Sequence, residues 1–157
     1  MAVEWNLADF QVEDLLSMAV VMEQKGYDFY SAVIEKSPER KVKNEIRFLR
    51  EEEARHKTLF QDMLKKKGKS ASHKMSAALE KILQREVIIP LEELLSSKKI
   101  ESNSDALSFG AAMEQKSIEF YTALAARPGA APLASDIAAI ITEEEGHKRK
   151  LAVMLAY

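Results

Sequence analysis

The sequence predicts an all-α protein, an antiparallel bundle of four long helices built from two copies of one helical hairpin. Three observations support this prediction. Apolar residues recur at steps of three and four over long stretches, and no useful length alternates with the period of two that is typical of a β-strand. Five glycines and four prolines are few for 157 residues, which favours long helices. One segment of the chain is also repeated 91 residues later.

Length and composition indicate one compact domain over residues 1–157. A hydrophobic fraction of 46% with 31% charged residues is typical of a globular protein. The net charge of −2 argues against nucleic acid or an anionic membrane as a partner. No apolar run approaches the ~20 residues of a membrane span, and the acidic first residues do not resemble a secretion signal. The absence of cysteine excludes disulfides and thiolate-ligated metal centres. We therefore expect a cytoplasmic protein.

The first hairpin is expected at about residues 10–67. Its two helices are predicted at 10–36 and 38–67, because Ser37-Pro38 interrupts the first amphipathic pattern and proline suits the first turn of a new helix. Gly68 follows three lysines, and this combination of cations and glycine is typical of a helix C-terminus.

The connection at residues 69–103 is too long for a tight turn between neighbouring helices. We expect short helices in it, one within the amphipathic stretch at 75–87 and a second piece after Pro90. His73 lies in the polar start of this connection and is predicted to be exposed to solvent.

The second hairpin is expected at about residues 104–156. Asn103-Ser104 offers N-cap side chains for a helix at 104–126, and Arg127-Pro128-Gly129 separates it from a last helix at 132–156.

The repeat is the most informative feature of the sequence. Residues 22–30 (MEQKGYDFY) and 113–121 (MEQKSIEFY) are identical at six of nine positions. The same offset relates Glu53 and His56 to Glu144 and His147, and Lys57 to Lys148. The hairpin therefore occurs twice in the chain.

Each predicted helix carries ionisable residues in the middle of its apolar face, when the face is followed in steps of three and four. The residues concerned are Glu23, Glu53, His56, Glu114, Glu144 and His147. Burying four carboxylates costs several kcal/mol each unless something compensates their charge, and none of the four faces contains lysine or arginine. Two divalent cations would balance four negative charges. Protonation of a cluster of acids and imidazoles is the less favoured alternative.

The spacing within the two Glu-x-x-His pairs agrees with a dinuclear metal site. Residues at i and i+3 share a helix face and can bind one ion jointly. One Glu from each of two helices and Glu-x-x-His from each of the other two is the ligand pattern of di-iron and di-manganese carboxylate bundles. We predict that all six residues are metal ligands and act in catalysis through the metal centre.

At these residues the chain resembles the ferritin-like superfamily, and within it the rubrerythrin-like di-iron carboxylate proteins without a rubredoxin domain. The resemblance implies a long crossover connection between the second and third helices and two Fe ions, with Mn or Zn as possible replacements. It implies that Glu23 and Glu114 are terminal ligands, that Glu53 and Glu144 bridge the ions, and that His56 and His147 bind one ion each. It also implies that Tyr30 and Tyr121 donate hydrogen bonds to carboxylate ligands.

The chain differs in three respects from the proteins that it resembles. Rubrerythrins typically carry a further glutamate three residues after the ligand of the third long helix, where this chain has Ser117. The cysteine-bearing electron-transfer domain is missing, so a reductase cycle would need a separate electron-donor protein. Ala54 stands where a bacterioferritin would carry the haem-binding methionine, so we expect no haem.

The resemblance implies a redox reaction of a non-haem di-iron centre with peroxide or dioxygen. The protein would then be an oxidoreductase of the peroxidase or ferroxidase type, with a role in oxidative stress, and a homo-oligomer, as a dimer or larger. Two alternatives remain open at this point: an iron-binding or storage protein without turnover, and a structural bundle that holds zinc or manganese.

Two further sets of residues allow two interpretations each. Ala19 and Gly110 lie one turn before the lone glutamates, where their small size either leaves space for an oxidant or allows close helix packing. The acids beside the Glu-x-x-His pairs form either a solvated surface, which we favour, or a path along which iron approaches. These acids are Glu51, Glu52, Glu143 and Glu145.

Overall fold

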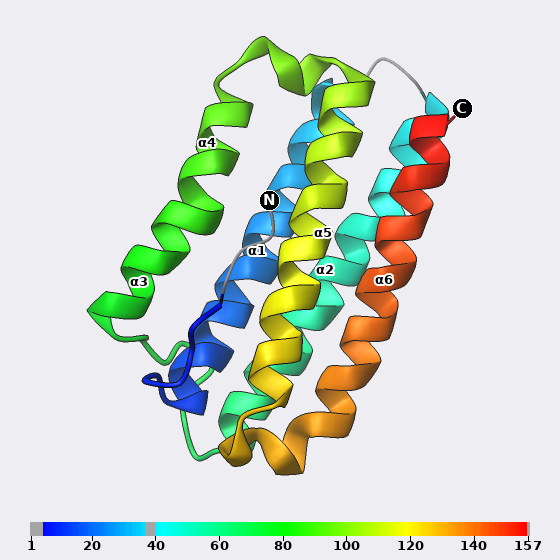
Figure 1. The fold of residues 1–157 in the computed structure, drawn as a ribbon. Helices are drawn as coiled ribbons and strands as arrows, with labels where there is room; N and C mark the ends of the chain where they lie inside the picture. Colours follow the sequence, from blue (N-terminus) through cyan, green and yellow to red (C-terminus); the bar gives the residue numbers. More distant parts are fainter. Residues whose placement is uncertain (1–4, 37–39, 157) are drawn as a thin grey trace.

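The computed structural model describes residues 5–36 and 40–156, and within these ranges every regular element is a helix (Figure 1). The long helices are α1 (Val12–Lys36), α2 (Arg40–Lys66), α5 (Asn103–Ala125) and α6 (Ala134–Ala156). The prediction of an all-α, ferritin-like four-helix bundle is confirmed. None of the described helices is both long and apolar enough to cross a membrane.

Two hairpins make up the bundle. The most extensive helix pairs are α1 with α2 and α5 with α6, and the hairpins meet where α1 packs on α5 and α2 packs on α6. Figure 1 shows that α2 and α5 run in the same direction, so the chain must travel back along the whole bundle between them. This return explains the length of the connection.

The connection contains α3 (Ala77–Leu83), a π-helical turn (Gln84–Ile88), α4 (Ile89–Leu95) and a 3-10 turn (Lys98–Glu101). It packs mainly on α1 and α5. Short helices are present as expected, and the π-helical turn joins α3 to α4 without a gap. Pro90 lies in the first turn of α4 and has no N–H for the carbonyl of Glu86, four residues earlier. The wider turn accommodates this proline within the helical run.

The ends of the long helices lie within a few residues of their expected positions, with local differences. The expected break at Ser37-Pro38 lies outside the described residues. Gly68 has a φ of 76°, and the N–H of Lys69 bonds to the carbonyl of Leu64 at 2.9 Å, so the glycine ends α2 as expected. The N-cap of α5 is Ser102, whose hydroxyl accepts from the N–H of Asp105, and not Asn103-Ser104.

His73 differs from its prediction. Its side chain is about a quarter exposed, and its Nε2 lies 2.9 Å from Oδ1 of Asp14 on α1. The other oxygen of Asp14 accepts from the N–H of Ser76 at 3.2 Å. The start of the connection is therefore tied to α1, and this long-range contact removes His73 from full solvent exposure.

The apolar core consists of two clusters with a polar layer between them. One cluster surrounds Leu16, Phe60 and Ile140, and the other surrounds Leu49 and Leu151. The predicted arrangement, apolar at both ends of each helix face and ionisable in the middle, is thus present in three dimensions.

Candidate metal centre

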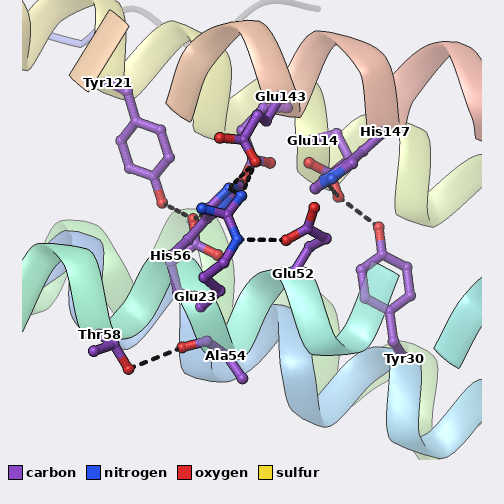
Figure 2. Close-up of polar contacts among 12 residues, drawn as sticks. Glu23, Tyr30, Glu52, Ala54, His56, Thr58, Glu114, Tyr121, Glu143 and His147 are labelled. Atoms are coloured by element: carbon purple, nitrogen blue, oxygen red, sulfur yellow. Dashed lines mark hydrogen bonds and ion pairs between the residues drawn. The ribbon is translucent and has the colours of Figure 1, made fainter. Parts of the chain in front are cut away.

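The six predicted ligands lie together in the polar layer, and none of them is more than 4% exposed. They come from all four long helices: α1 carries Glu23, α2 carries Glu53 and His56, α5 carries Glu114, and α6 carries Glu144 and His147. Four of them are labelled in Figure 2, which also shows the tyrosines beside them. The repeat places these residues at one height because both hairpins have the same register.

Their donor atoms form two groups, and within each group the atoms lie within 4.8 Å of one another. The first group is Glu53, Glu114, Glu144 and His147; the second is Glu23, His56 and Glu144. Glu144 belongs to both groups, which is the geometry that a bridging carboxylate requires. Glu53 belongs to the first group alone, so its bridging role remains a prediction.

The two histidines present Nδ1 to the carboxylates. Nδ1 of His56 lies 2.6 Å from Oε1 of Glu144 and 3.6 Å from Oε1 of Glu23. Nδ1 of His147 lies 3.8 Å from Oε1 of Glu114. The two rings are stacked with their centroids 5.7 Å apart. Each imidazole therefore offers the same nitrogen to the centre.

Both tyrosines donate hydrogen bonds to the lone glutamates, Glu23 and Glu114, which are the predicted ligands outside the Glu-x-x-His pairs. Each bond crosses between the hairpins. Tyr30 of α1 donates to Glu114 of α5 at 2.6 Å, and Tyr121 of α5 donates to Glu23 of α1 at 2.7 Å (Figure 2). Each bond leaves the second oxygen of its carboxylate unpartnered. The tyrosines thus orient the glutamates and join the hairpins at the centre.

Unpartnered donor atoms test whether a metal fits this cluster. Oε2 of Glu23, Oε2 of Glu114, Oε2 of Glu144 and Nδ1 of His147 are buried and have no hydrogen-bond partner. Among the side chains that the structure describes, at residues 5–36 and 42–156, no lysine or arginine pairs with any of the four carboxylates. Buried groups of this kind are costly without a cation. A set of carboxylate oxygens and imidazole nitrogens suits iron, manganese or zinc.

The pKa values of the carboxyl groups diverge within the cluster. Burial, reinforced by the neighbouring glutamates, raises the pKa of Glu53 and of Glu144 well above 4.5. Burial acts in the same direction on Glu114, but the neighbouring Glu144 and His147 and the hydrogen bond from Tyr30 lower its pKa to about 2. Without a metal, burial therefore favours the protonated forms of Glu53 and Glu144, and metal binding competes with these protons.

A second polar network lies behind His56. Arg55 contacts Glu143 of α6 and donates to Glu52 at 2.7 Å, and Nε2 of His56 lies 3.3 Å from Oε2 of Glu143. Of the four flanking acids, Glu143 thus touches a predicted ligand, a role that the sequence analysis missed. Its position directly before Glu144 was the available signal. The sequence did not indicate that Glu143 would lie beside His56 of the other hairpin, because this contact depends on the packing of α2 against α6.

The repeated glutamine and lysine form a matched pair of contacts on the flanks of the bundle. Lys57 donates to Gln24 at 2.7 Å, and Lys148 donates to Gln115 at 2.6 Å. Each glutamine follows a lone glutamate in the chain, and each lysine follows a histidine. These bonds hold the two helices of each hairpin in the register that brings the ligands together. They explain why the glutamine and the lysine, which are not ligands, are also identical in the two copies of the repeat.

Small residues near the centre have different roles. A Cβ at Gly26 would lie 2.7 Å from Oε2 of Glu53, so a side chain there would displace this carboxylate. A Cβ at Gly110 would meet Leu151 and Phe29 at 3.3 Å, and Ala19 is fully buried in the apolar core. Close packing is therefore the correct interpretation of Ala19 and Gly110. The residue that gives the centre room is Gly26.

Comparison with known proteins agrees with this geometry. A family model described as Rubrerythrin matches residues 14–155, from the first turn of α1 to the end of α6. No curated protein and no solved structure matches the chain. The match covers all six predicted ligands and both tyrosines.

Proposed function

This chain belongs to the rubrerythrin family of ferritin-like di-iron proteins, and on that premise we propose that it is an oxidoreductase whose two iron ions react with hydrogen peroxide or dioxygen. The observation that carries the proposal is the buried cluster of two ligand groups that share Glu144 and contain unpartnered donor atoms. Such a cluster is suited to bind cations, and without them its buried charges would destabilise the fold.

In this proposal each ion is held by residues of both hairpins. Glu114, Glu144, His147 and Glu53 would hold one ion, and Glu23, His56 and Glu144 would hold the other. Bound iron would supply the redox chemistry of the centre.

The protein contributes orientation, proton storage and exclusion of water. Tyr30 and Tyr121 hold one oxygen of each lone glutamate, so the other oxygen remains directed to a metal. Burial raises the pKa of Glu53 and of Glu144 and so favours their protonated forms when no ion is bound. The apolar clusters above and below the centre keep bulk water from the ligands.

Electrons for a catalytic cycle would come from another protein. The chain contains no cysteine and therefore no rubredoxin-type iron site of its own. We accordingly place the electron donor on a separate partner.

Anaerobic loading with ferrous iron, followed by hydrogen peroxide or dioxygen, tests the proposal. We expect two iron ions per chain and rapid oxidation of both, followed by optical absorption of ferric iron. Uptake of many irons per chain would favour storage instead. Two bound ferrous ions that react with neither oxidant would contradict the redox function.

A matched pair of variants tests the site. Glu53→Ala removes a predicted ligand and should abolish binding of at least one ion, whereas Glu119→Ala, on the flank of α5, should retain both. Equal metal content in the two variants would contradict the site assignment.

A further inference from the structure

A line of aromatic rings leads from the metal centre towards the surface at the start of the described chain. Tyr121 of α5 donates to Glu23, a predicted ligand, at 2.7 Å (Figure 2). The ring centroid of Phe120 lies 5.8 Å from that of Tyr121, and the indole of Trp5 lies 5.2 Å from Phe120. Tyr121 and Phe120 are fully buried, whereas Trp5 is partly exposed. The indole thus connects a buried phenol beside the centre with solvent.

The two ends of this line are the aromatic side chains that lose one electron most easily. Indole and phenol can be oxidised to radicals, and the benzene ring of phenylalanine resists this oxidation. Centroid separations of 5.8 and 5.2 Å on either side of Phe120 keep Tyr121 and Trp5 within about 11 Å of each other. Because Phe120 fills the space between them, an electron can pass from the indole to the phenol without crossing solvent.

The equivalent line in the other half of the bundle has no such end. The ring of Tyr30 lies 5.1 Å from that of Phe29, which lies 5.2 Å from that of Phe109. This line ends on phenylalanine, and Trp5 is the single tryptophan of the sequence. Among the ring contacts that the structure describes, a pair of easily oxidised side chains therefore extends towards the surface from Tyr121 and not from Tyr30.

The surroundings of the indole argue against a purely structural role for Trp5. Its Nε1 is buried and has no hydrogen-bond partner among the residues that the structure describes. A buried indole N–H that lacks an acceptor is costly, and a phenylalanine would pack in an apolar site without that cost. The same feature determines the form of an oxidised Trp5. With no acceptor for its proton, the indole would remain a cation radical.

We propose that Trp5 and Tyr121 form a one-electron path that carries oxidising equivalents from the metal centre to the protein surface. The proposal rests on the proposed redox function and gives the N-terminal segment a role in it. The path acts when hydrogen peroxide meets a centre that holds a single ferrous ion. Peroxide then requires two electrons while the ion supplies one, and the indole supplies the other.

Electrons and protons balance in this step. Reduction of hydrogen peroxide to two water molecules breaks the O–O bond and consumes two electrons and two protons, which solvent supplies. The ferrous ion becomes ferric, and Trp5 becomes a cation radical after its electron has passed through Tyr121. The phenol proton of Tyr121 moves to Oε1 of Glu23 during this passage and then returns. Ascorbate at the surface restores the indole by giving one electron, and it releases a proton as it becomes the ascorbyl radical.

Radical transfer in the zinc-loaded protein tests the path without iron chemistry. Azidyl radicals generated by pulse radiolysis oxidise indole, and we expect the tryptophan radical to decay while a tyrosyl radical forms, at a rate independent of protein concentration. Tyr121→Phe should abolish the tyrosyl signal, whereas Tyr27→Phe, on the flank of α1, should retain it. Decay without tyrosyl formation in the wild type, or a tyrosyl signal that persists in Tyr121→Phe, would overturn the path.

The reaction of hydrogen peroxide with a chain that carries a single ferrous ion tests the role of the path. Protein frozen after mixing should show the electron paramagnetic resonance of a tryptophan radical, and Trp5→Phe should lose this signal. Phe10→Leu changes a partly buried ring at the same end of the molecule, outside the ring contacts described above, and should retain it. No tryptophan radical in the wild type, or loss of the signal in both variants, would contradict the role of Trp5.

Deuterated water tests the form of the radical. The cation radical keeps its exchangeable indole proton, so its resonance should narrow in deuterated water. A spectrum that deuterated water leaves unchanged would contradict the cation form and the lack of an acceptor at Nε1 of Trp5.

The two proposals fail in different ways. Radical transfer in the zinc-loaded protein, combined with bound iron that reacts with no peroxide, contradicts the redox function and not the connection between the rings. Oxidation of bound ferrous iron, with no radical transfer between Trp5 and Tyr121, contradicts the path alone.

Discussion

The two hairpins carry the same ligands in different surroundings. Glu23, Glu53 and His56 of the first hairpin match Glu114, Glu144 and His147 of the second, and the tyrosines and the glutamine-lysine contacts match as well. Next to the ligands, however, Gly26 corresponds to Ser117 and Arg55 to Gly146. The repeat thus preserves the candidate ligands and varies the residues around them.

This difference makes the two ligand groups unequal. The first group has four members, of which Glu53 and Glu114 line a pocket between α1, α5 and the connection. The second group has three members and lies beside Arg55 and Glu143. In the proposed di-iron centre, the ion of the first group would be accessible to an oxidant, while Glu143 and Arg55 would stabilise His56 at the other ion. The comparison predicts that equivalent substitutions in the two hairpins will have unequal effects.

The largest effect is expected at Glu144, the shared residue. Glu144→Ala removes a ligand from both groups, so we expect loss of both ions, whereas Glu53→Ala should spare the second group. Metal analysis of the purified variants after iron loading measures the difference. Two ions retained by Glu144→Ala would show that the groups do not share this carboxylate.

Gly26 and Ser117 provide the next test. Gly26→Ala places a Cβ 2.7 Å from Oε2 of Glu53, and because this atom ends a flexible side chain, the carboxylate should move while the fold persists. We expect the ion of the first ligand group, which contains Glu53, to bind at least about tenfold more weakly. Unfolding stability should change by no more than about 1 kcal/mol. Ser117→Ala, measured by the same metal titration and urea unfolding, should alter neither quantity.

Glu143 and Glu52 occupy equivalent positions but have different contacts. Glu143→Gln weakens the support of His56, so we expect about 10- to 100-fold weaker binding at the second group. Glu52 contacts Arg55 at the surface and no ligand, so Glu52→Gln should change the affinity less than about threefold. Calorimetric titration with zinc compares the two. Equal losses would assign the effect to Arg55 rather than to His56.

The last expected effect concerns pH and is confined to the metal-free protein. The pKa values of Glu53 and Glu144 lie above 4.5 in the folded state, so their contribution to stability is complete below pH 4.5 and is lost as the pH rises through the raised values. The free energy of unfolding should fall by at most about 1.4 kcal/mol per pH unit for each group.

Urea unfolding of the metal-free chain between pH 5 and pH 7.5 measures this slope. Glu53→Gln, which cannot ionise, should flatten it, and bound metal should remove it because the protons are already displaced. Stability of the metal-free protein that increases with pH over this range would contradict the assigned direction.

Much of the centre could be predicted because its information is local and repeated. The helical period places Glu53 and His56 on one face, and the offset of 91 residues transfers that face to Glu144 and His147. The lack of cations on these faces predicted that something else must neutralise the acids. None of these steps needed a contact between distant residues.

The features that the sequence did not predict all depend on contacts between residues that are distant in the chain. His73 was predicted to be exposed, but Asp14 of α1 lies beside it. The π-helical turn that joins α3 to α4, and the hydrogen bond from Lys116 to this turn, were not predicted. Glu143 appeared to be a surface acid, but the packing of α2 against α6 brings it to His56.

The sequence alone determined the helices, the duplicated hairpin and the six candidate ligands, because periodicity and repeat register are properties of the chain. Only the tertiary structure decided that each tyrosine donates a hydrogen bond to a glutamate of the opposite hairpin and that Glu144 belongs to both ligand groups. It also decided that Gly26 and Ser117 line a pocket beside Glu53. The reason is physical: these features depend on the rotation and height of one hairpin against the other, and side-chain packing across the whole bundle sets both.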